Sequence, residues 1–230
     1  MAFLDVLFED NHVLVVNKPA GLLVHGDETG DVCLADLAKE YIKEKYNKPG
    51  NVFIGVVHRL DRPVSGVVLL AKTSKALSRL NELFRSKKTI KTYWAVVLNK
   101  PTVEQQTLVH WLIKDSSRNV TTAYARENSK GLRSELSYRL IAQHNKHYLL
   151  EVNPVTGRPH QIRVQLASMH CPIAGDLRYG AGNPLPDKSI ALHARSLQFE
   201  HPTLKTMVTV SAPLPSAPIW KPFKSNDYSY

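Results

Sequence analysis

The Asp61 loop, residues 58–64, places one carboxylate between two guanidinium groups, those of Arg59 and Arg62. Arginine stays protonated at any ordinary pH, and an opposite charge within a few ångströms favours the ionised form of an acid. We therefore expect Asp61 to be a carboxylate at neutral pH, which suits a nucleophile better than a proton donor. From these residues alone, a turn aspartate with surface arginines is an equally good interpretation.

The composition favours one folded domain with a polyanionic partner. A length of 230 residues is short for two ordinary domains, so we expect a single domain over residues 1–230. The hydrophobic fraction of 43% is enough for a core. The formal net charge of +10 favours nucleic acid over a membrane as the partner, because lysine and arginine displace phosphate counterions. Solubility alone is the other interpretation of this charge.

Several other classes of protein lack support in the sequence. No apolar run approaches the ~20 residues that cross a bilayer, and the first residues do not resemble a secretory signal, so we expect a cytoplasmic protein. Cys33 and Cys171 form no C-x-x-C pair, which predicts two reduced thiols. His144 and His147 have no cluster of carboxylates or cysteines beside them. We expect no metal and no cofactor.

Rigid elements are expected on both sides of the Asp61 loop. The spacing of apolar residues predicts an amphipathic helix that begins near Leu34 and ends near Asn47. A second helix is expected after Thr73, whose hydroxyl can cap it. The basic face of this second helix is either solvated or in contact with RNA. Strands are expected at residues 3–8, 13–16, 52–57 and 67–71.

The second half of the chain predicts a largely antiparallel meander. Pro159 is well placed to begin a helix over residues 160–167. The strands are expected at residues 89–98, 107–114, 120–126, 134–142, 148–153 and 207–210. These patterns together predict an α+β fold, with a mainly antiparallel mixed sheet and flanking helices.

Short motifs spread over most of the chain, taken together, resemble the RluA-type family of RNA pseudouridine synthases. Each motif is weak alone, and their occurrence in this order carries the resemblance. The motifs are Asn17-Lys18-Pro19-Ala20-Gly21-Leu22, His58-Arg59-Leu60-Asp61, Ser65-Gly66, Lys91-Thr92-Tyr93-Trp94-Ala95, Gly157-Arg158-Pro159-His160-Gln161-Ile162-Arg163, Gly175-Asp176-Leu177-Arg178-Tyr179-Gly180 and Leu192-His193-Ala194.

The resemblance implies a pseudouridine synthase catalytic fold with a central active-site cleft. It implies isomerisation of uridine in a structured rRNA or tRNA, without a cofactor: the N1 glycosidic bond breaks, uracil rotates while held, and C5 bonds to C1′. By the same resemblance, Asp61 is the catalytic carboxylate, Tyr93 contacts the target base, and Arg163 pairs with Asp61. Attack at C1′, attack at C6 and elimination to a glycal all stay open.

The resemblance also implies residues that bind the substrate. Arg59 is expected to fill the space of the uridine, which must leave the stack because its sugar and base are inaccessible in a paired helix. Ile162 is expected to supply an apolar wall. Two departures from the family pattern, Val64 and His170, touch none of the catalytic residues. Further substrate-binding or cleft-shaping residues are expected to be Lys18, His58 and His160.

Two other functions stay open from the sequence. A non-catalytic RNA-binding or RNA-folding protein on the same scaffold has no need of a carboxylate that faces phosphates. Hydrolysis of a glycosidic bond requires a second carboxylate, for which Asp176 is the residue to check. We take a monomer as the default state, and the sequence does not specify the modified nucleotide. Phosphate contacts are expected from Arg79, Arg85, Lys87, Lys88 and the region from Lys114 to Arg133.

Overall fold

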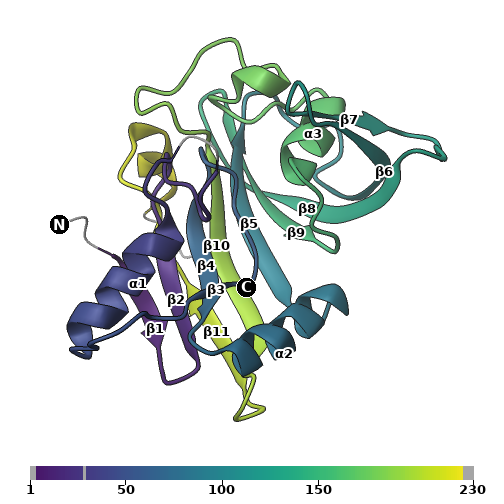
Figure 1. Cartoon of the computed structure of the whole chain (residues 1–230). Coiled ribbons are helices and arrows are strands. Elements are labelled where there is room, and N and C mark those ends of the chain that lie inside the picture. The colour runs from purple at the N-terminus through teal and green to yellow at the C-terminus, as the bar shows by residue number, and fades with distance from the viewer. Residues whose placement is uncertain (1–3, 28–29, 225–230) are drawn as a thin grey trace. The chain divides into compact units, whose positions relative to one another are not determined.

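The computed structural model describes residues 4–27 and 30–224 (Figure 1). The chain divides into two compact units, which are described separately. Unit 1 consists of Met1–Lys91 and Ala194–Pro213, and unit 2 consists of Thr92–His193 and Leu214–Tyr230. The single domain over residues 1–230 stays a prediction.

The strands of unit 1 form a sheet in the order β1-β2-β4-β10, with β3 also paired to β4 and β11 to β10. Every residue of β4 is buried, as expected of a strand that is covered on both faces. The pairs β1–β2, β2–β4, β3–β4 and β10–β11 are antiparallel. The bounds are Val6–Glu9 for β1, Val13–Lys18 for β2, Gly55–Val56 for β3, Ser65–Ala71 for β4, Leu192–Glu200 for β10 and Met207–Ser211 for β11.

Two helices of unit 1 follow the predicted patterns. Helix α1 spans Leu34–Lys45 and helix α2 spans Ser74–Arg85. The Thr73 hydroxyl accepts the N–H of Ala76 at 3.1 Å, which confirms the expected cap of α2. Among the described residues, no helix is long and apolar enough to cross a membrane.

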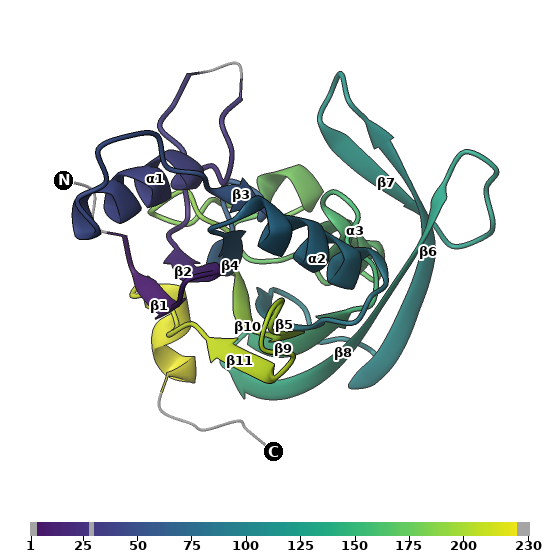
Figure 2. The same ribbon diagram turned by 60° about the horizontal axis from the view of Figure 1, so that its bottom comes forward.

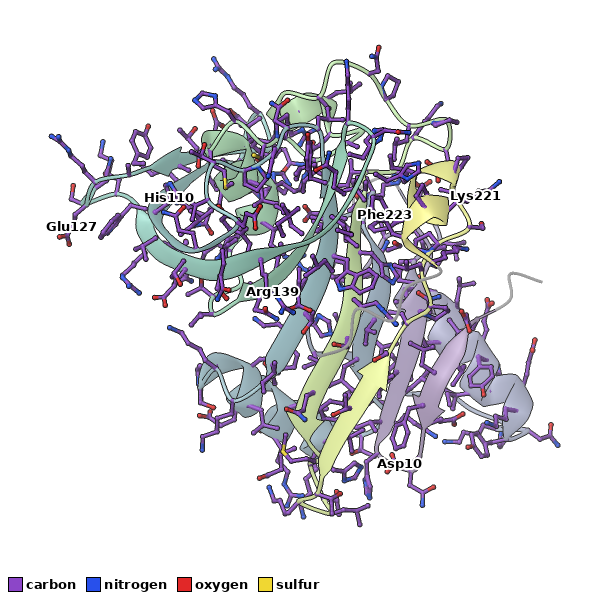
Figure 3. All side chains as sticks on the ribbon, turned by 180° about the vertical axis from the view of Figure 1, so that it is seen from behind. Asp10, His110, Glu127, Arg139, Lys221 and Phe223 are labelled. Atoms are coloured by element: carbon purple, nitrogen blue, oxygen red, sulfur yellow. The ribbon has the colours of Figure 1, made fainter. Side chains whose placement is uncertain are left out.

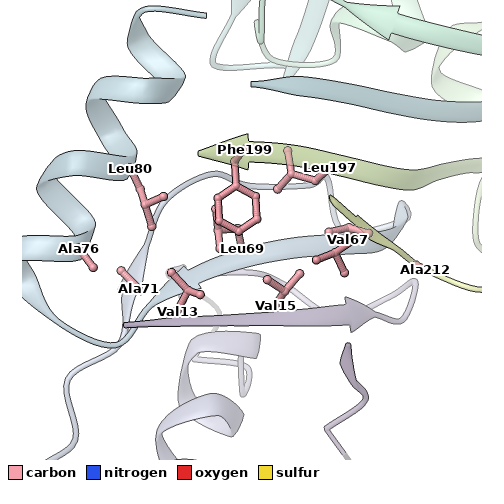
Figure 4. Packing of buried hydrophobic residues seen from close by; sticks show 11 residues of the cluster. Val13, Val15, Val67, Leu69, Ala71, Ala76, Leu80, Leu197, Phe199 and Ala212 are labelled. Carbon is pink, nitrogen blue, oxygen red and sulfur yellow. The ribbon is translucent and has the colours of Figure 1, made fainter. Parts of the chain in front are cut away.

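The core of unit 1 lies between α2 and the sheet (Figure 4). Ala76 and Leu80 of α2 pack against apolar side chains of the strands, and full burial of one such large side chain stabilises the fold by roughly 1.5–3 kcal/mol. The strands contribute Val13, Val15, Val67, Leu69, Ala71, Leu197, Phe199, Val210 and Ala212 to this cluster.

Gly66 at the start of β4 allows a close approach of the β10 main chain. Its φ of +114° lies in the region that favours glycine, and a Cβ at this position would lie 2.3 Å from the carbonyl oxygen of Ala194. The glycine of the Ser65-Gly66 motif is therefore needed for the packing of unit 1.

The strands of unit 2 are antiparallel and lie in the order β5-β9-β8-β6-β7. The expected meander is therefore wrong in its strand order, because β5 pairs with β9 and β6 with β8. Figure 2 shows β6 and β8 as long, curved strands, and helix α3, Gln161–Ser168, contacts both β6 and β7. The expected mainly antiparallel α+β fold is confirmed. The bounds are Ile90–Val97 for β5, Gln105–Asp115 for β6, Val120–Tyr124 for β7, Leu132–His144 for β8 and His147–Pro154 for β9.

Three predicted element boundaries need correction, and one strand was not predicted. The strand expected at 52–57 is only the two-residue β3, because β2 occupies one edge of β4 and β10 pairs along the other. The first strand begins at Val6, and Phe3 lies outside the described residues. Strand β10 was not expected, because polar residues interrupt its apolar pattern. Helix α3 begins at Gln161, because His160 before it has a left-handed conformation with φ of 56°.

Two acidic side chains, Asp10 and Glu9, join neighbouring segments of unit 1 through hydrogen bonds. Asp10, labelled in Figure 3, lies in the turn between β1 and β2 and accepts the N–H groups of His12 and Val13 at 2.7 and 2.8 Å. The Nε2 atom of His201, in the turn between β10 and β11, lies 2.7 Å from the same carboxylate. The two turns are therefore attached to each other.

The second acidic side chain, Glu9, joins β1 to α1 and to the end of β4. Its side chain is only 7% exposed and lies 2.6 Å from Lys45 Nζ and 2.7 Å from Lys72 Nζ. The hydroxyls of Tyr41 and Tyr46 also donate to it, at 2.9 and 2.8 Å. Burial raises the pKa of Glu9, but the hydrogen bonds from these four residues outweigh it and lower the pKa to about 2.

The low pKa of Glu9 predicts a loss of stability in acid. A depressed carboxyl pKa stabilises the fold above the unfolded-state value near 4.5, and this contribution disappears as the pH falls through about 2. We expect the free energy of unfolding to fall between pH 5 and pH 2 by about 3 kcal/mol more in the wild type than in Glu9→Gln. Urea unfolding at a series of pH values measures both slopes. Glu40→Gln, which changes an exposed residue of α1, should retain the wild-type slope, and equal slopes for Glu9→Gln and the wild type would contradict the prediction.

Candidate functional site

The Asp61 loop connects β3 to β4 and is held at its start by the ring of His58. The Nε2 atom of His58 accepts the N–H of Leu69 at 3.0 Å, and the ring stacks on Phe84 with centroids 4.9 Å apart. Burial, aided by the charge of Lys91, lowers the pKa of His58 to about 3. The ring is therefore neutral at neutral pH, with its proton on Nδ1, as acceptance at Nε2 requires.

Hydrogen bonds between Arg62 and Gly21 hold the middle of the loop. Gly21 donates its N–H to the carbonyl of Arg62 at 2.7 Å, and Arg62 Nε donates to the carbonyl of Gly21 at 3.0 Å. Within the loop, the N–H of Val64 donates to the carbonyl of Asp61 at 3.0 Å, so the expectation that Val64 does not touch Asp61 is wrong for its main chain. The Asn17–Leu22 motif and the Asp61 loop are thus attached to each other.

Lys18 completes this attachment from inside the protein. Its side chain is 0% exposed, and Nζ donates to the carbonyls of Pro19 at 2.9 Å, Leu22 at 2.8 Å and Arg62 at 3.3 Å. Three acceptors match the three N–H groups of an ammonium. Burial lowers the pKa of Lys18 to about 7; the charge of Asp61 opposes this shift and that of Arg62 adds to it. These contacts support the cleft-shaping role expected of Lys18, and a contact between Lys18 and the substrate stays a prediction.

The side chains of the loop alternate between the core and the solvent. Leu60 and Val64 are 8% and 3% exposed, so they anchor the loop in the core. The valine at position 64 therefore lies in an apolar environment, where a threonine hydroxyl would need a partner. Asp61 is half-buried and Arg59 is exposed. A half-buried carboxylate on a fixed loop, next to an exposed cation, remains accessible to a substrate and does not serve the packing of the core.

Arg163 of α3, the other charged residue expected at the site, lies in unit 2. Its Nε donates to Asp176 Oδ2 at 2.7 Å, and Nη2 donates to Asp176 Oδ1 at 2.9 Å. Both side chains are nearly inaccessible, with 7% and 1% exposed. A bidentate pair of this kind is the geometry in which two opposite charges can be buried together.

Side chains also fix the start of α3. The Oε1 atom of Gln161 accepts the hydroxyl of Thr156 at 2.7 Å and the N–H of Arg158 at 3.0 Å, while its Nε2 donates to the carbonyl of Glu135 at 3.1 Å. Gln161 therefore holds the turn before α3 against β8. His160, the residue before it, lies 2.7 Å from the hydroxyl of Tyr179 through Nδ1.

Asp176 and Tyr179 both belong to the Gly175–Gly180 motif, which forms a tight turn beside the start of α3. Both glycines have left-handed conformations, with φ of 84° and 101°, and a Cβ on Gly175 would lie 2.7 Å from the carbonyl oxygen of Ser189. Between them lies the short 3-10 helix η1, Leu177–Tyr179. The glycines of this motif therefore permit a turn that other residues would strain.

The same segment contacts the outer edge of β7. Tyr179 accepts the N–H of Thr121 at 2.9 Å, and Arg178 Nη1 donates to the carbonyl of Asn119 at 2.6 Å. The Thr121 hydroxyl donates to the carbonyl of Pro159 at 3.1 Å. Helix α3, the Gly175–Gly180 motif and β7 are thus linked by hydrogen bonds through named side chains.

The remaining expected site residues lie in β5 and α3. Tyr93 is half-buried in β5, where it pairs with Val152 of β9. Ile162 is 8% exposed, so only a small part of its surface is accessible. Among the expected residues, Lys18, His58, Arg59 and Asp61 lie in unit 1, and Tyr93, His160, Ile162 and Arg163 lie in unit 2.

The residues expected to contact phosphates are exposed, with one correction. Arg79 donates through Nη1 to the carbonyl of Pro202 at 2.8 Å, so it supports unit 1 and is only half exposed. The basic residues that are exposed are Arg85, Lys87 and Lys88 at the end of α2, and Lys114, Arg118, Arg126, Lys130 and Arg133 around β7.

Comparison with known proteins gives a consistent result. A family model described as RNA pseudouridylate synthase matches residues 12–168. The chain is 35% identical over 215 residues to ribosomal large subunit pseudouridine synthase C of Vibrio cholerae, with coverage of 91% of this chain and 65% of that protein. It is 36% identical over 237 residues to ribosomal large subunit pseudouridine synthase D of Xylella fastidiosa, with coverage of 92% and 66%. The chain spans about two thirds of the length of these curated relatives.

A solved structure supports the fold. The chain resembles human RNA pseudouridylate synthase domain containing 4 with a TM-score of 0.77 and 25% sequence identity. The alignment covers 92% of this chain and 89% of the human chain. The expected catalytic-domain fold is therefore confirmed over most of the sequence.

The burial of Lys18 predicts a clear loss of stability on substitution. Lys18→Met keeps the length of the side chain but leaves three main-chain carbonyls without their donor, so we expect the free energy of unfolding to fall by about 3 kcal/mol. Urea unfolding measures this change. The matched control is Lys39→Met, which removes an exposed ion pair with Asp36 and should cost less than about 0.5 kcal/mol. Equal stability of the two variants would show that the carbonyl contacts of Lys18 contribute little.

Proposed function

Because the chain belongs to the RNA pseudouridylate synthase family, we propose that it isomerises uridine to pseudouridine in a structured RNA. The observation that carries the proposal is the Asp61 loop, a half-buried carboxylate on a loop that Lys18 and His58 hold from inside. The names of two similar proteins refer to the large ribosomal subunit, so rRNA is the first substrate to test. A tRNA substrate stays a second prediction.

In the proposed reaction, Asp61 is the catalytic carboxylate. The N1–C1′ bond of the uridine breaks, the uracil rotates, C5 bonds to C1′, and the proton lost from C5 is balanced by one gained at N1. Asp61 attacks C1′ or C6, or assists elimination to a glycal. We propose that Arg163 pairs with Asp61 and keeps it ionised, and that Tyr93 contacts the base and handles the C5 proton.

RNA binding is proposed to come from exposed cations and a small apolar surface. Arg59 is exposed, and it is proposed to occupy the position that the uridine leaves. Ile162 is proposed to contact the base, and His160 to shape the site beside it. His58 and Lys18 are proposed to act on the substrate through the position of the Asp61 loop. The exposed basic residues at the end of α2 and around β7 are proposed to supply phosphate contacts, in keeping with the net charge of +10.

The environment of Asp176 disfavours glycosidic hydrolysis as the activity. A hydrolase of this type needs two carboxylates at the reacting bond. Asp176 is 1% exposed, and both of its oxygens accept hydrogen bonds from Arg163. It is therefore poorly placed to protonate a leaving group or to activate water. A cytoplasmic location and a monomeric state stay predictions.

The proposed role of Asp61 predicts a specific loss of activity. Tritium release from C5-labelled uridine in rRNA, tRNA and total RNA measures the reaction under single-turnover conditions. We expect Asp61→Asn to lower the rate by about 10³-fold or more, with RNA affinity within about threefold of the wild type, because the carboxylate reacts and does not bind phosphate. Glu44→Gln, which removes an exposed carboxylate of α1, should retain the wild-type rate.

Two results would contradict the proposal in different ways. A wild-type rate in Asp61→Asn would show that another group carries the reaction. No tritium release by the wild type from any of these RNAs, together with tight RNA binding, would favour the non-catalytic RNA-binding protein. Mapping of pseudouridines in a strain that lacks this protein would identify the modified nucleotide.

A further inference from the structure

We propose that Asp176 and Tyr179 are positioning residues for the reaction, and that they act through the guanidinium of Arg163. This inference rests on the proposed function, in which Arg163 pairs with the catalytic carboxylate. It gives a role to the Gly175–Gly180 motif, whose residues have no other part in the proposed reaction.

Asp176 fixes the plane of the guanidinium. A guanidinium has five N–H donors in a rigid planar fork, and Asp176 binds one of its edges through Nε and Nη2 at 2.7 and 2.9 Å. Two parallel bonds prevent the group from rotating about the bond that joins it to the side chain. The edge formed by Nη1 and Nη2 then has a defined direction, and this edge also has the geometry to bind a carboxylate.

The ring of Tyr179 restricts movement of the Arg163 guanidinium out of its own plane. The Cζ atom of Arg163 lies over its ring, 5.0 Å from the centroid, so the ring supports one face of the plane. The ring itself is held by its hydroxyl, which lies 2.7 Å from Nδ1 of His160 and accepts the N–H of Thr121 at 2.9 Å. Arg163 is therefore fixed both within its plane and across it.

The main chain around Asp176 makes this support rigid. The N–H of Asp176 donates to the carbonyl of Ile173 at 3.0 Å, and its own carbonyl accepts the N–H groups of Tyr179 at 3.1 Å and Ala181 at 3.0 Å. The left-handed conformations of Gly175 and Gly180 permit this arrangement. These hydrogen bonds hold Asp176 in a closed turn, and Asp176 in turn holds the guanidinium of Arg163.

Burial makes the position of Arg163 depend on Asp176. With 7% and 1% of the two side chains exposed, water cannot replace Asp176 as the partner of the guanidinium. Without the carboxylate, the guanidinium must tilt toward solvent or toward another acceptor. Either movement changes the direction in which Arg163 meets the catalytic carboxylate, while the RNA-binding surface stays as it was.

The test is to separate the reaction step from RNA binding in Asp176→Asn. This variant keeps the shape of the side chain and removes its charge. We expect the single-turnover rate of pseudouridine formation to fall by about 10²-fold, with the RNA dissociation constant within about twofold of the wild type, because a small displacement of a positioning group affects the reaction step. An unchanged rate in a folded Asp176→Asn protein would overturn the inference.

A double-mutant cycle tests whether Asp176 acts through Arg163. In an Arg163→Gln background, Asp176→Asn should change the rate by less than about threefold, because the group that it positions is already gone. Multiplicative losses in the double mutant would overturn the inference. Tyr179→Leu, which leaves the ion pair intact, should lower the rate about tenfold. Tyr179→Phe, which retains the ring but loses the hydroxyl contacts that hold it, should recover only part of that loss. Equal rates in Tyr179→Leu and the wild type would overturn the role of Tyr179.

A stability control separates positioning from simple destabilisation. Tyr138→Phe removes a buried hydrogen bond from the Tyr138 hydroxyl to the carbonyl of Val103, 2.8 Å long, in the same unit. It should lower the unfolding midpoint and leave the single-turnover rate of the folded protein unchanged. A rate loss in Tyr138→Phe as large as that in Asp176→Asn would overturn the inference. If the wild type is active, Asp61→Asn is inactive and Asp176→Asn is fully active, the inference alone is overturned. An inactive wild type would overturn the proposed function as well.

Discussion

A buried ammonium must find acceptors within the protein, and in unit 1 this requirement fixes the position of the Asp61 loop. Lys18 lies at the end of β2, opposite Gly66 of β4. Its three acceptors are the carbonyls of Pro19, Leu22 and Arg62, which belong to two segments far apart in the sequence. Because an unsatisfied buried charge costs far more than a hydrogen bond, the two segments cannot separate without exposing the ammonium. The side chain of Asp61, which is proposed to react, is therefore positioned through the main chain of its loop, by contacts that Lys18 makes.

The buried cations of the two units have different hydrogen-bond partners. Lys18 binds neutral carbonyl oxygens, so its charge can also act on the nearby carboxylate of Asp61. Arg163 binds the carboxylate of Asp176 in a bidentate pair, so part of its charge is neutralised and its orientation is fixed. His58, a half-buried base of unit 1, is neutral and serves as an acceptor. Unit 1 thus holds a buried positive charge close to the carboxylate of Asp61, and unit 2 holds a buried positive charge in a fixed direction.

Much of the fold could be predicted from the sequence, because α1, α2 and the strands of unit 2 each have a clear local period. Strand β3 could not, since its length depends on which strand occupies the edge of β4. The burial of Lys18 was also missed, because lysine is almost always exposed, although the buried run from Val13 to Val16 just before it was a usable signal. Asp176 drew attention as a second carboxylate. Its bond to Arg163 depends on the turn of the Gly175–Gly180 motif, which sequence spacing does not reveal.

The contacts of this motif with β7 have a consequence beyond the reaction. β7 is the last strand of the sheet in unit 2, and the open edge of a sheet offers main-chain groups to which a strand of another molecule can add. Tyr179 occupies the N–H of Thr121, and Arg178 occupies the carbonyl of Asn119 at the start of this edge. Strand addition at this point would therefore have to displace both side chains. The segment that contacts Arg163 thus also covers part of the open edge of unit 2.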